Sequence, residues 1–167
     1  MKKKTIIGGC LIILIAVGFF SARRTSTLFN LLFPPSDMFI SLASQDVDLT
    51  KTGKIRLLFQ PKYPGAHSLD LEVEKLDFGK PFKGKILLDV SVKNKKNESV
   101  INRRVAGPTS SFLGNQRKGF VLESFMVPDQ IGIGEKATVE VTILTADPDL
   151  MGTYGSAKLA VNKGGDK

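Results

Sequence analysis

Side chains capable of covalent or proton-transfer chemistry are few and scattered in this sequence. The 167-residue chain holds one histidine, His67, and one cysteine, Cys10. Catalytic nucleophiles and bases work in pairs, so a lone histidine at the edge of a loop is expected to be structural or solvated. These two residues also cannot form a disulfide or a four-ligand zinc site. Ser110 and Ser111 lie near Lys118, but no spacing singles out a serine–lysine dyad. We therefore expect no enzymatic activity and no cofactor.

Two Asp-x-Asp pairs carry oxygen ligands of the kind that calcium binds: Asp46 with Asp48, and Asp147 with Asp149. Neither pair is followed by the further oxygens and central glycine of an EF-hand loop. Pro148 instead favours a turn in which Asp147 caps backbone amides. No metal site is predicted, and a small-ligand or calcium-binding domain is kept as the alternative function.

The run from Gly79 to Lys85, GKPFKGK, has the composition of a phosphate-binding loop but lacks its context. A phosphate loop opens a helix whose N-terminus receives the anion, whereas this run precedes a predicted strand. We expect a solvated turn here.

One segment combines loop residues with apolar side chains. Residues 106–118, AGPTSSFLGNQRK, place Phe112 and Leu113 where a loop tip would normally be polar, with Arg117 and Lys118 beside them. Loops on rigid scaffolds often carry recognition, and an aromatic anchor beside an arginine is typical of interaction hot spots. We predict that Phe112, Leu113, Arg117 and Lys118 contact a partner; alternatively, Phe112 folds inward and closes one end of the domain.

The elements that must position these residues are short strands. Apolar and polar residues alternate with a period of two, the pattern of half-buried antiparallel strands. The runs are 47–50, 55–59, 69–74, 86–92, 100–105, 119–127, 137–143 and 157–161. They predict an all-β fold, an immunoglobulin-like antiparallel β-sandwich of about seven to eight strands, with a closed barrel as the alternative. The likeness is architectural, because the tryptophan and the cysteine pair of antibody domains are missing.

The N-terminus has the pattern of a membrane-directed segment. An apolar run is preceded by lysines and followed by arginines, and 18 residues from Thr5 to Ala22 would span about 27 Å as a helix. The excess of positive charge before the run predicts a single-pass protein of the bacterial inner membrane, with its C-terminal domain in the periplasm. The anchor residues are Lys2, Lys3, Lys4, Ile6, Phe20, Arg23 and Arg24.

Two other readings of this segment remain open. Ala16–Gly18 could precede a signal-peptidase cut, and Ile7–Cys10 loosely resembles a lipoprotein signal. The predicted domains are a signal anchor at 1–24, a juxtamembrane linker at 25–45, a β-sandwich at 46–162 and a flexible tail at 163–167. Within the linker, residues 28–33 form an interfacial helix before two prolines, or else pack on the domain.

The net charge of +8 is concentrated around the apolar run, since five of the 24 basic residues flank it. Residues 25–167 carry a net charge of only +3. Residues 80–118 carry ten basic and two acidic side chains, whereas residues 120–150 carry one basic and six acidic side chains. This asymmetry suggests a polarised domain, and nucleic acid is not an expected partner outside the cytoplasm.

Turn and strand-edge patterns carry a resemblance. Val47–Thr50 with Gly53, and Asp147–Leu150 with Gly152, resemble uncharacterised bacterial envelope proteins with an immunoglobulin-like sandwich domain, over residues 46–162. The resemblance implies the fold and the compartment, and such families have no settled activity. The expected function is that of a protein-interaction or assembly module of the envelope, with an immunity protein that neutralises a toxin as a specific variant. The expected partners are the lipid bilayer and an unknown envelope protein.

Overall fold

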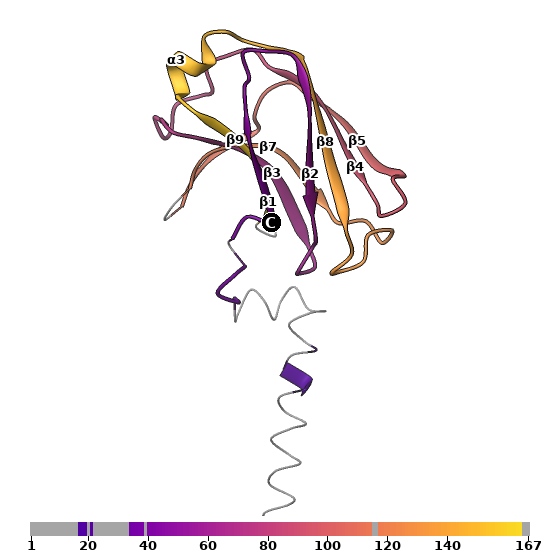
Figure 1. Cartoon of the computed structure of the whole chain (residues 1–167). Coiled ribbons are helices and arrows are strands. Elements are labelled where there is room, and N and C mark those ends of the chain that lie inside the picture. The colour runs from indigo at the N-terminus through magenta and orange to yellow at the C-terminus, as the bar shows by residue number, and fades with distance from the viewer. Residues whose placement is uncertain (1–16, 20, 22–33, 39, 115–116, 165–167) are drawn as a thin grey trace, which may run out of the picture.

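The computed structural model describes residues 17–19, 21, 34–38, 40–114 and 117–164, and in this part of the chain strands dominate. Figure 1 shows them as two packed layers, with the short helix α3 at the end opposite the start of the first strand. The elements are β1 (Ala43–Val47), β2 (Gly53–Phe59), β3 (Ala66–Val73), β4 (Leu87–Lys93), β5 (Ser99–Val105), β6 (Ser110–Leu113), β7 (Lys118–Met126), β8 (Ala137–Thr145), α3 (Leu150–Tyr154) and β9 (Ala157–Lys163).

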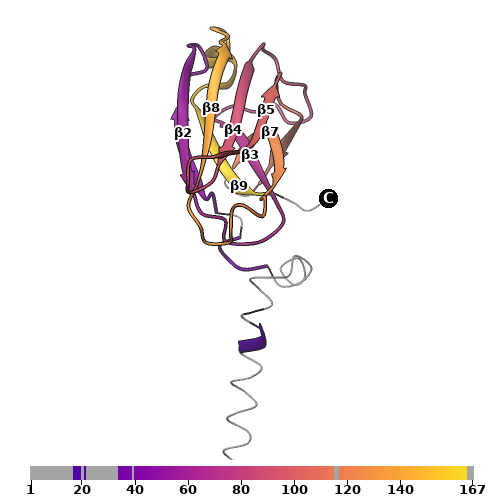
Figure 2. The same ribbon diagram turned by 90° about the vertical axis from the view of Figure 1, so that its right-hand side faces the viewer.

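The strands form two antiparallel sheets. The five-stranded sheet has the order β1-β9-β3-β7-β6, and the four-stranded sheet has the order β2-β8-β4-β5. Figure 2 shows β2, β8, β4 and β5 side by side in one layer. The prediction of an antiparallel β-sandwich is confirmed, and the closed-barrel alternative is wrong because the strands divide into two separate sheets.

The core lies between the two inner faces, as the alternating pattern requires. In β8, Val139 and Val141 are fully buried, and β3 and β9 contribute Leu69, Leu71 and Leu159, also with no exposed surface. Each such side chain stabilises the fold by about 1.5 to 3 kcal/mol relative to exposure. Their neighbours at the alternate positions face outward, which explains why period two predicts seven of the strands. The predicted opening strand at 47–50 is misplaced, because β1 ends at Val47 and a turn follows it.

Two elements were not predicted. β6 has only four residues, too few for alternation to stand out, and it converts much of the expected 106–118 loop into a hairpin with β7. The helix α3 has five residues, too short for a helical period, and buries Leu150 and Tyr154. Both depend on tertiary contacts more than on local sequence pattern.

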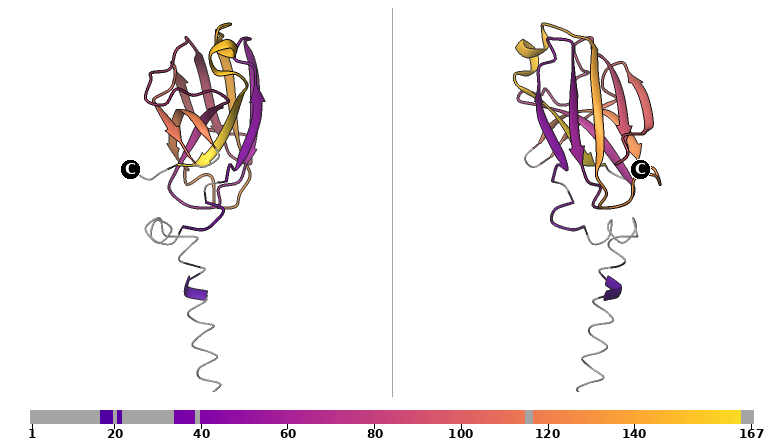
Figure 3. Two further views of the ribbon diagram at one scale, coloured as in Figure 1. Left: turned by 90° about the vertical axis from the view of Figure 1, so that its left-hand side faces the viewer. Right: turned by 45° about the vertical axis from the view of Figure 1, so that its right-hand side comes forward.

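The ends of the sandwich lie slightly outside the predicted bounds 46–162. β1 begins at Ala43, and β9 continues to Lys163, which is nearly buried and so belongs to the sheet rather than to a tail. Val161 pairs with Ala43, so β9 ends where β1 begins (Figure 3). Just before β1, Asp37 accepts hydrogen bonds from Lys62 Nζ at 3.0 Å and Tyr63 Oη at 2.5 Å. This part of the expected linker packs on the sandwich.

The predicted membrane segment is not covered by these observations. Lys2, Lys3, Lys4, Ile6, Phe20, Arg23 and Arg24 lie outside the described residues, as do residues 28–33 of the expected interfacial helix. Among the residues that the structure does describe, no helix is long and apolar enough to cross a membrane.

Candidate binding surfaces

The four predicted contact residues lie on or beside the β6–β7 hairpin. Phe112 pairs with Gly119 and Leu113 with Lys118, and the turn is closed by a hydrogen bond from the Gly114 N–H to the Arg117 carbonyl at 2.7 Å. Leu113 is 62% exposed, whereas Phe112 is only half-buried and faces the outer side of the sheet opposite Gly119. The alternative in which Phe112 closes the end of the sandwich is therefore wrong.

The hairpin approaches the neighbouring strand very closely at Gly119. A Cβ atom at this position would lie 2.0 Å from the carbonyl oxygen of Leu71 in β3. Only glycine can occupy such a position without moving one of the two strands. Gly119 therefore sets how tightly β7 packs against the centre of the five-stranded sheet.

Arg117 fixes the hairpin to the outer face of this sheet. Its Nη1 donates hydrogen bonds to Ser41 Oγ at 3.2 Å, to Glu72 Oε1 at 3.3 Å and to Asn162 Oδ1. We call Arg117 with Ser41, Glu72 and Asn162 the Arg117 clamp. The Arg117 and Glu72 side chains are 28% and 17% exposed, so the guanidinium is largely committed to contacts within the molecule.

A buried carboxyl group lies next to the clamp. Asn162 Nδ2 donates a hydrogen bond to Asp70 Oδ2 at 2.6 Å, and Asp70 is only 5% exposed. Burial raises the pKa of Asp70, although the Asn162 amide and the nearby Arg117 charge oppose that rise. The outer face of β3 thus carries a connected polar network, in which Asn162 links Asp70 to Arg117.

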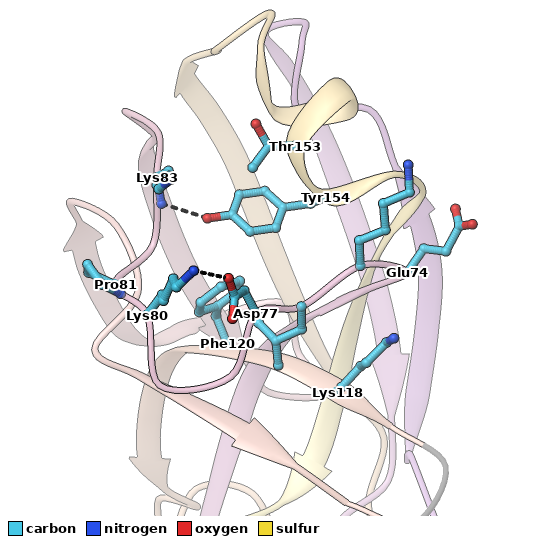
Figure 4. A pocket seen from close by; sticks show the side chains of 11 residues that line it. Glu74, Asp77, Lys80, Pro81, Lys83, Lys118, Phe120, Thr153 and Tyr154 are labelled. Carbon is cyan, nitrogen blue, oxygen red and sulfur yellow. Dashed lines mark hydrogen bonds and ion pairs between the residues drawn. The ribbon is translucent and has the colours of Figure 1, made fainter.

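A second feature, a cavity of about 530 Å³, lies beside the hairpin. We call it the Tyr154 pocket. Its lining includes Tyr154, Phe120 and four lysines, which are Lys75, Lys80, Lys83 and Lys118. Figure 4 shows Tyr154 and Thr153 on one side, facing Lys80 and Asp77, with Glu74 and Lys118 along another side. Lys118 therefore belongs to both the hairpin and the pocket.

An aromatic cluster supports this pocket, and two of its three rings, Tyr154 and Phe120, line it. The ring of Tyr154 stacks on Phe82 at 5.2 Å between centroids and meets the edge of Phe120 at 5.3 Å. The Tyr154 hydroxyl accepts a hydrogen bond from the Lys83 backbone N–H at 2.6 Å. These contacts hold the phenol in one position, because α3, β7 and the 74–86 connection each supply one ring.

The two carboxylates of the pocket already have partners. Glu74 accepts hydrogen bonds from the Ser156 N–H and hydroxyl, both at 3.2 Å, and these bonds lower the pKa of Glu74. Asp77 forms an ion pair with Lys80 at 2.5 Å, which raises the pKa of Lys80. Among the described residues, Lys75, Lys83 and Lys118 have no acidic partner within ion-pair distance.

The other candidate residues have structural roles. His67 is fully buried on the inner face of β3, between the rings of Phe59 and Phe125, so of the two expected roles, structural or solvated, it has the structural one. Asp147 accepts hydrogen bonds from the backbone N–H groups of Lys85 and Asp149, as a turn cap does. Within the described part of the chain, no three or more His, Cys, Asp or Glu side chains gather as metal ligands would.

Ion pairs join the basic and acidic segments of the sequence. Glu140, on the outer face of the four-stranded sheet, contacts Lys54, Arg56 and Lys93 at 2.8 to 2.9 Å. Hydrogen bonds from Lys93 and Lys54 lower the pKa of Glu140 to about 2. Glu135 pairs with Lys95 at 2.6 Å. Two of these pairs, Lys93–Glu140 and Lys95–Glu135, join the basic segment to the acidic one, so the two segments do not form fully separate faces.

The Tyr154 pocket was not foreseen because its residues come from distant segments. The one available signal was the 74–86 connection, long for a sandwich and rich in lysine and glycine. Gly84 and Gly155 have positive φ angles where the backbone passes the pocket, and a Cβ on Gly155 would lie 2.6 Å from Glu74 Oε2.

Comparison of the chain with protein-family models, curated proteins and solved structures gave no match to any of them.

Proposed function

We propose that this protein is a non-enzymatic, membrane-anchored protein-interaction or assembly module of the bacterial envelope, with an immunoglobulin-like sandwich in the periplasm. The observation that carries this proposal is the geometry of the β6–β7 hairpin, which presents the exposed side chain of Leu113 beside Lys118. The resemblance to envelope proteins and the charge pattern of the N-terminus support the compartment. An immunity protein that neutralises a toxin is a specific form of this function.

Fixing a contact residue before binding lowers the entropy lost on association. The Arg117 clamp does this for the hairpin, because Arg117 binds both Glu72 of β3 and Asn162 of β9. Leu113 then lies on a short edge strand whose position is set by the sheet. An exposed apolar side chain beside a cation suits a partner surface with an apolar recess and acidic rim.

The state of the sole histidine supports a binding role over catalysis. His67 is buried among aromatic rings, and its Nδ1 is 3.1 Å from the carbonyl oxygen of Gly65, which fixes Nδ1 as the donor. A general base must reach the proton that it abstracts, and this ring has no exposed surface.

The proposal is tested by purifying the full-length protein with its partners from detergent-solubilised membranes. Leu113→Ala should abolish co-purification of a specific protein that the wild type retains. Leu58→Ala is the matched control, because Leu58 is 72% exposed on the outer face of the other sheet. Retention of the partner by Leu113→Ala, or equal loss with Leu58→Ala, would contradict the assignment of the hairpin as the contact surface.

A further inference from the structure

We propose that the Tyr154 pocket binds a small oxyanion ligand, a carboxylate or a phosphate carried on a compact apolar body. This site shares Lys118 with the hairpin that carries Leu113, and its other lining residues lie outside the proposed partner contact. Its cavity of about 530 Å³ lies within the range of 300 to 1,000 Å³ that is typical of small-molecule sites.

The charge of the pocket favours an anion. Of its four lysines, only Lys80 has an acidic partner, so Lys75, Lys83 and Lys118 remain as cations without an ion pair among the described residues. Glu74 opposes them with a single carboxylate, and that carboxylate is bound to Ser156. The excess of positive charge attracts oxyanions and repels cationic ligands.

The Tyr154 hydroxyl adds a directional donor. It accepts one hydrogen bond, from the Lys83 N–H, and none of the described residues accepts its proton. Tyr154 is only 7% exposed, and its stacking on Phe82 and contact with Phe120 keep the phenol in place. A fixed O–H in the wall of a lysine-rich cavity can donate to an oxyanion, while the nearby ring edges and Leu76 contact an apolar body.

The composition of the chain provides a sensitive reporter for this site. There are no tryptophans and two tyrosines, Tyr63 and Tyr154, so the variant Tyr63→Phe leaves Tyr154 as the only source of tyrosine fluorescence. The full-length Tyr63→Phe protein in detergent is titrated with cyclohexyl phosphate and with cyclohexanecarboxylate at constant ionic strength. Cyclohexanol serves as the neutral probe of the same shape. The two charged probes show which oxyanion the site prefers.

We expect a saturable change in tyrosine fluorescence with at least one charged probe, with a Kd on the order of 1 mM, and no saturable change with cyclohexanol. Lys118→Gln and Lys75→Gln, each in the Tyr63→Phe background, should weaken binding about three- to tenfold, because each removes one charge-assisted contact. Lys136→Gln is the matched control, since Lys136 is an exposed lysine at the other end of the sandwich.

Calorimetry of Tyr154→Phe, which keeps the ring but lacks the donor, should show a similar weakening. The proposal is overturned if neither charged probe gives a saturable response, if cyclohexanol binds equally well, or if Lys136→Gln weakens binding as much as Lys118→Gln. These outcomes do not depend on whether Leu113 contacts a partner.

Discussion

Replacing Arg117 with alanine tests whether the clamp holds the β6–β7 hairpin in place. The substitution removes the donor of three hydrogen bonds, to Ser41, Glu72 and Asn162. Hydrogen bonds to a charged group contribute about 1.5 to 3 kcal/mol and neutral ones about 1 kcal/mol. Because Arg117 and Glu72 are 28% and 17% exposed, water can replace part of this stabilisation. We expect the free energy of unfolding to fall by about 2 to 3 kcal/mol.

The measurement is equilibrium urea denaturation of the full-length protein in detergent, followed by far-ultraviolet circular dichroism. Arg103→Ala is the control, because Arg103 is an exposed arginine on the edge strand β5 and forms no ion pair among the described residues. Its effect should stay within about 0.5 kcal/mol. Arg117→Lys keeps the charge but not the planar guanidinium, so its effect should be intermediate.

Hydrogen exchange separates a local effect from a global one. If the clamp orders the hairpin, the amides of Gly114 and Lys118 should exchange faster in Arg117→Ala than the amides of β4, relative to wild type. A loss of stability equal to that of Arg103→Ala, or unchanged exchange at the hairpin, would refute the role of the clamp. The supposed preorganisation of Leu113 would then lose its physical basis.

Three further predictions concern the two sheets. Gly119→Ala should lower the free energy of unfolding, measured by urea denaturation, by about 2 to 3 kcal/mol, because the new Cβ would lie 2.0 Å from the Leu71 carbonyl oxygen. Gly53→Ala is the control and should be nearly neutral, because no atom lies within 4 Å of the position of its Cβ. Glu140→Gln should cost about 1 to 2 kcal/mol at pH 7, after allowance for solvent around Lys54 and Arg56. Because the pKa of Glu140 is lowered from 4.5 to about 2, this stabilisation is present above pH 4.5 and is lost as the pH falls towards 2, so the two unfolding curves should converge in acid. The pKa of Asp70 is raised above its ordinary value of 3.8, so the ionised carboxylate destabilises the folded state at pH values above 3.8. Asp70→Asn should therefore increase the free energy of unfolding at pH 7. In thermal melts below pH 3.8 this gain in stability should disappear.

The strands were predictable because each buries one face. Alternation such as Val139, Val141 and Ile143 against Thr138 and Glu140 specifies both the strand and its buried side. The same rule placed Leu69 and Leu71 in the core. A pattern of period two carries no information on which strands pair, so the division into five- and four-stranded sheets came only from the structure.

The candidate binding surfaces were predictable only in part. The apolar pair in the 106–118 segment pointed to the hairpin, but the sequence could not show that Arg117 reaches Asn162, 45 residues away along the chain. Nor could it show that Phe82, Phe120 and Tyr154 meet. Contacts of this kind depend on the path of the backbone, which local composition does not determine.

The first and last strands of the sandwich lie side by side, and this placement has a mechanical consequence. β1 and β9 are neighbouring antiparallel strands, and Ala43, at the start of one, pairs with Val161, near the end of the other. A force that separates the two chain ends would therefore load one hydrogen bond of this pair after another, as in opening a zipper. Such a domain resists extension weakly between its own ends, whereas a load applied between Ala43 and the distant tip of the sandwich is carried by several bonds in parallel.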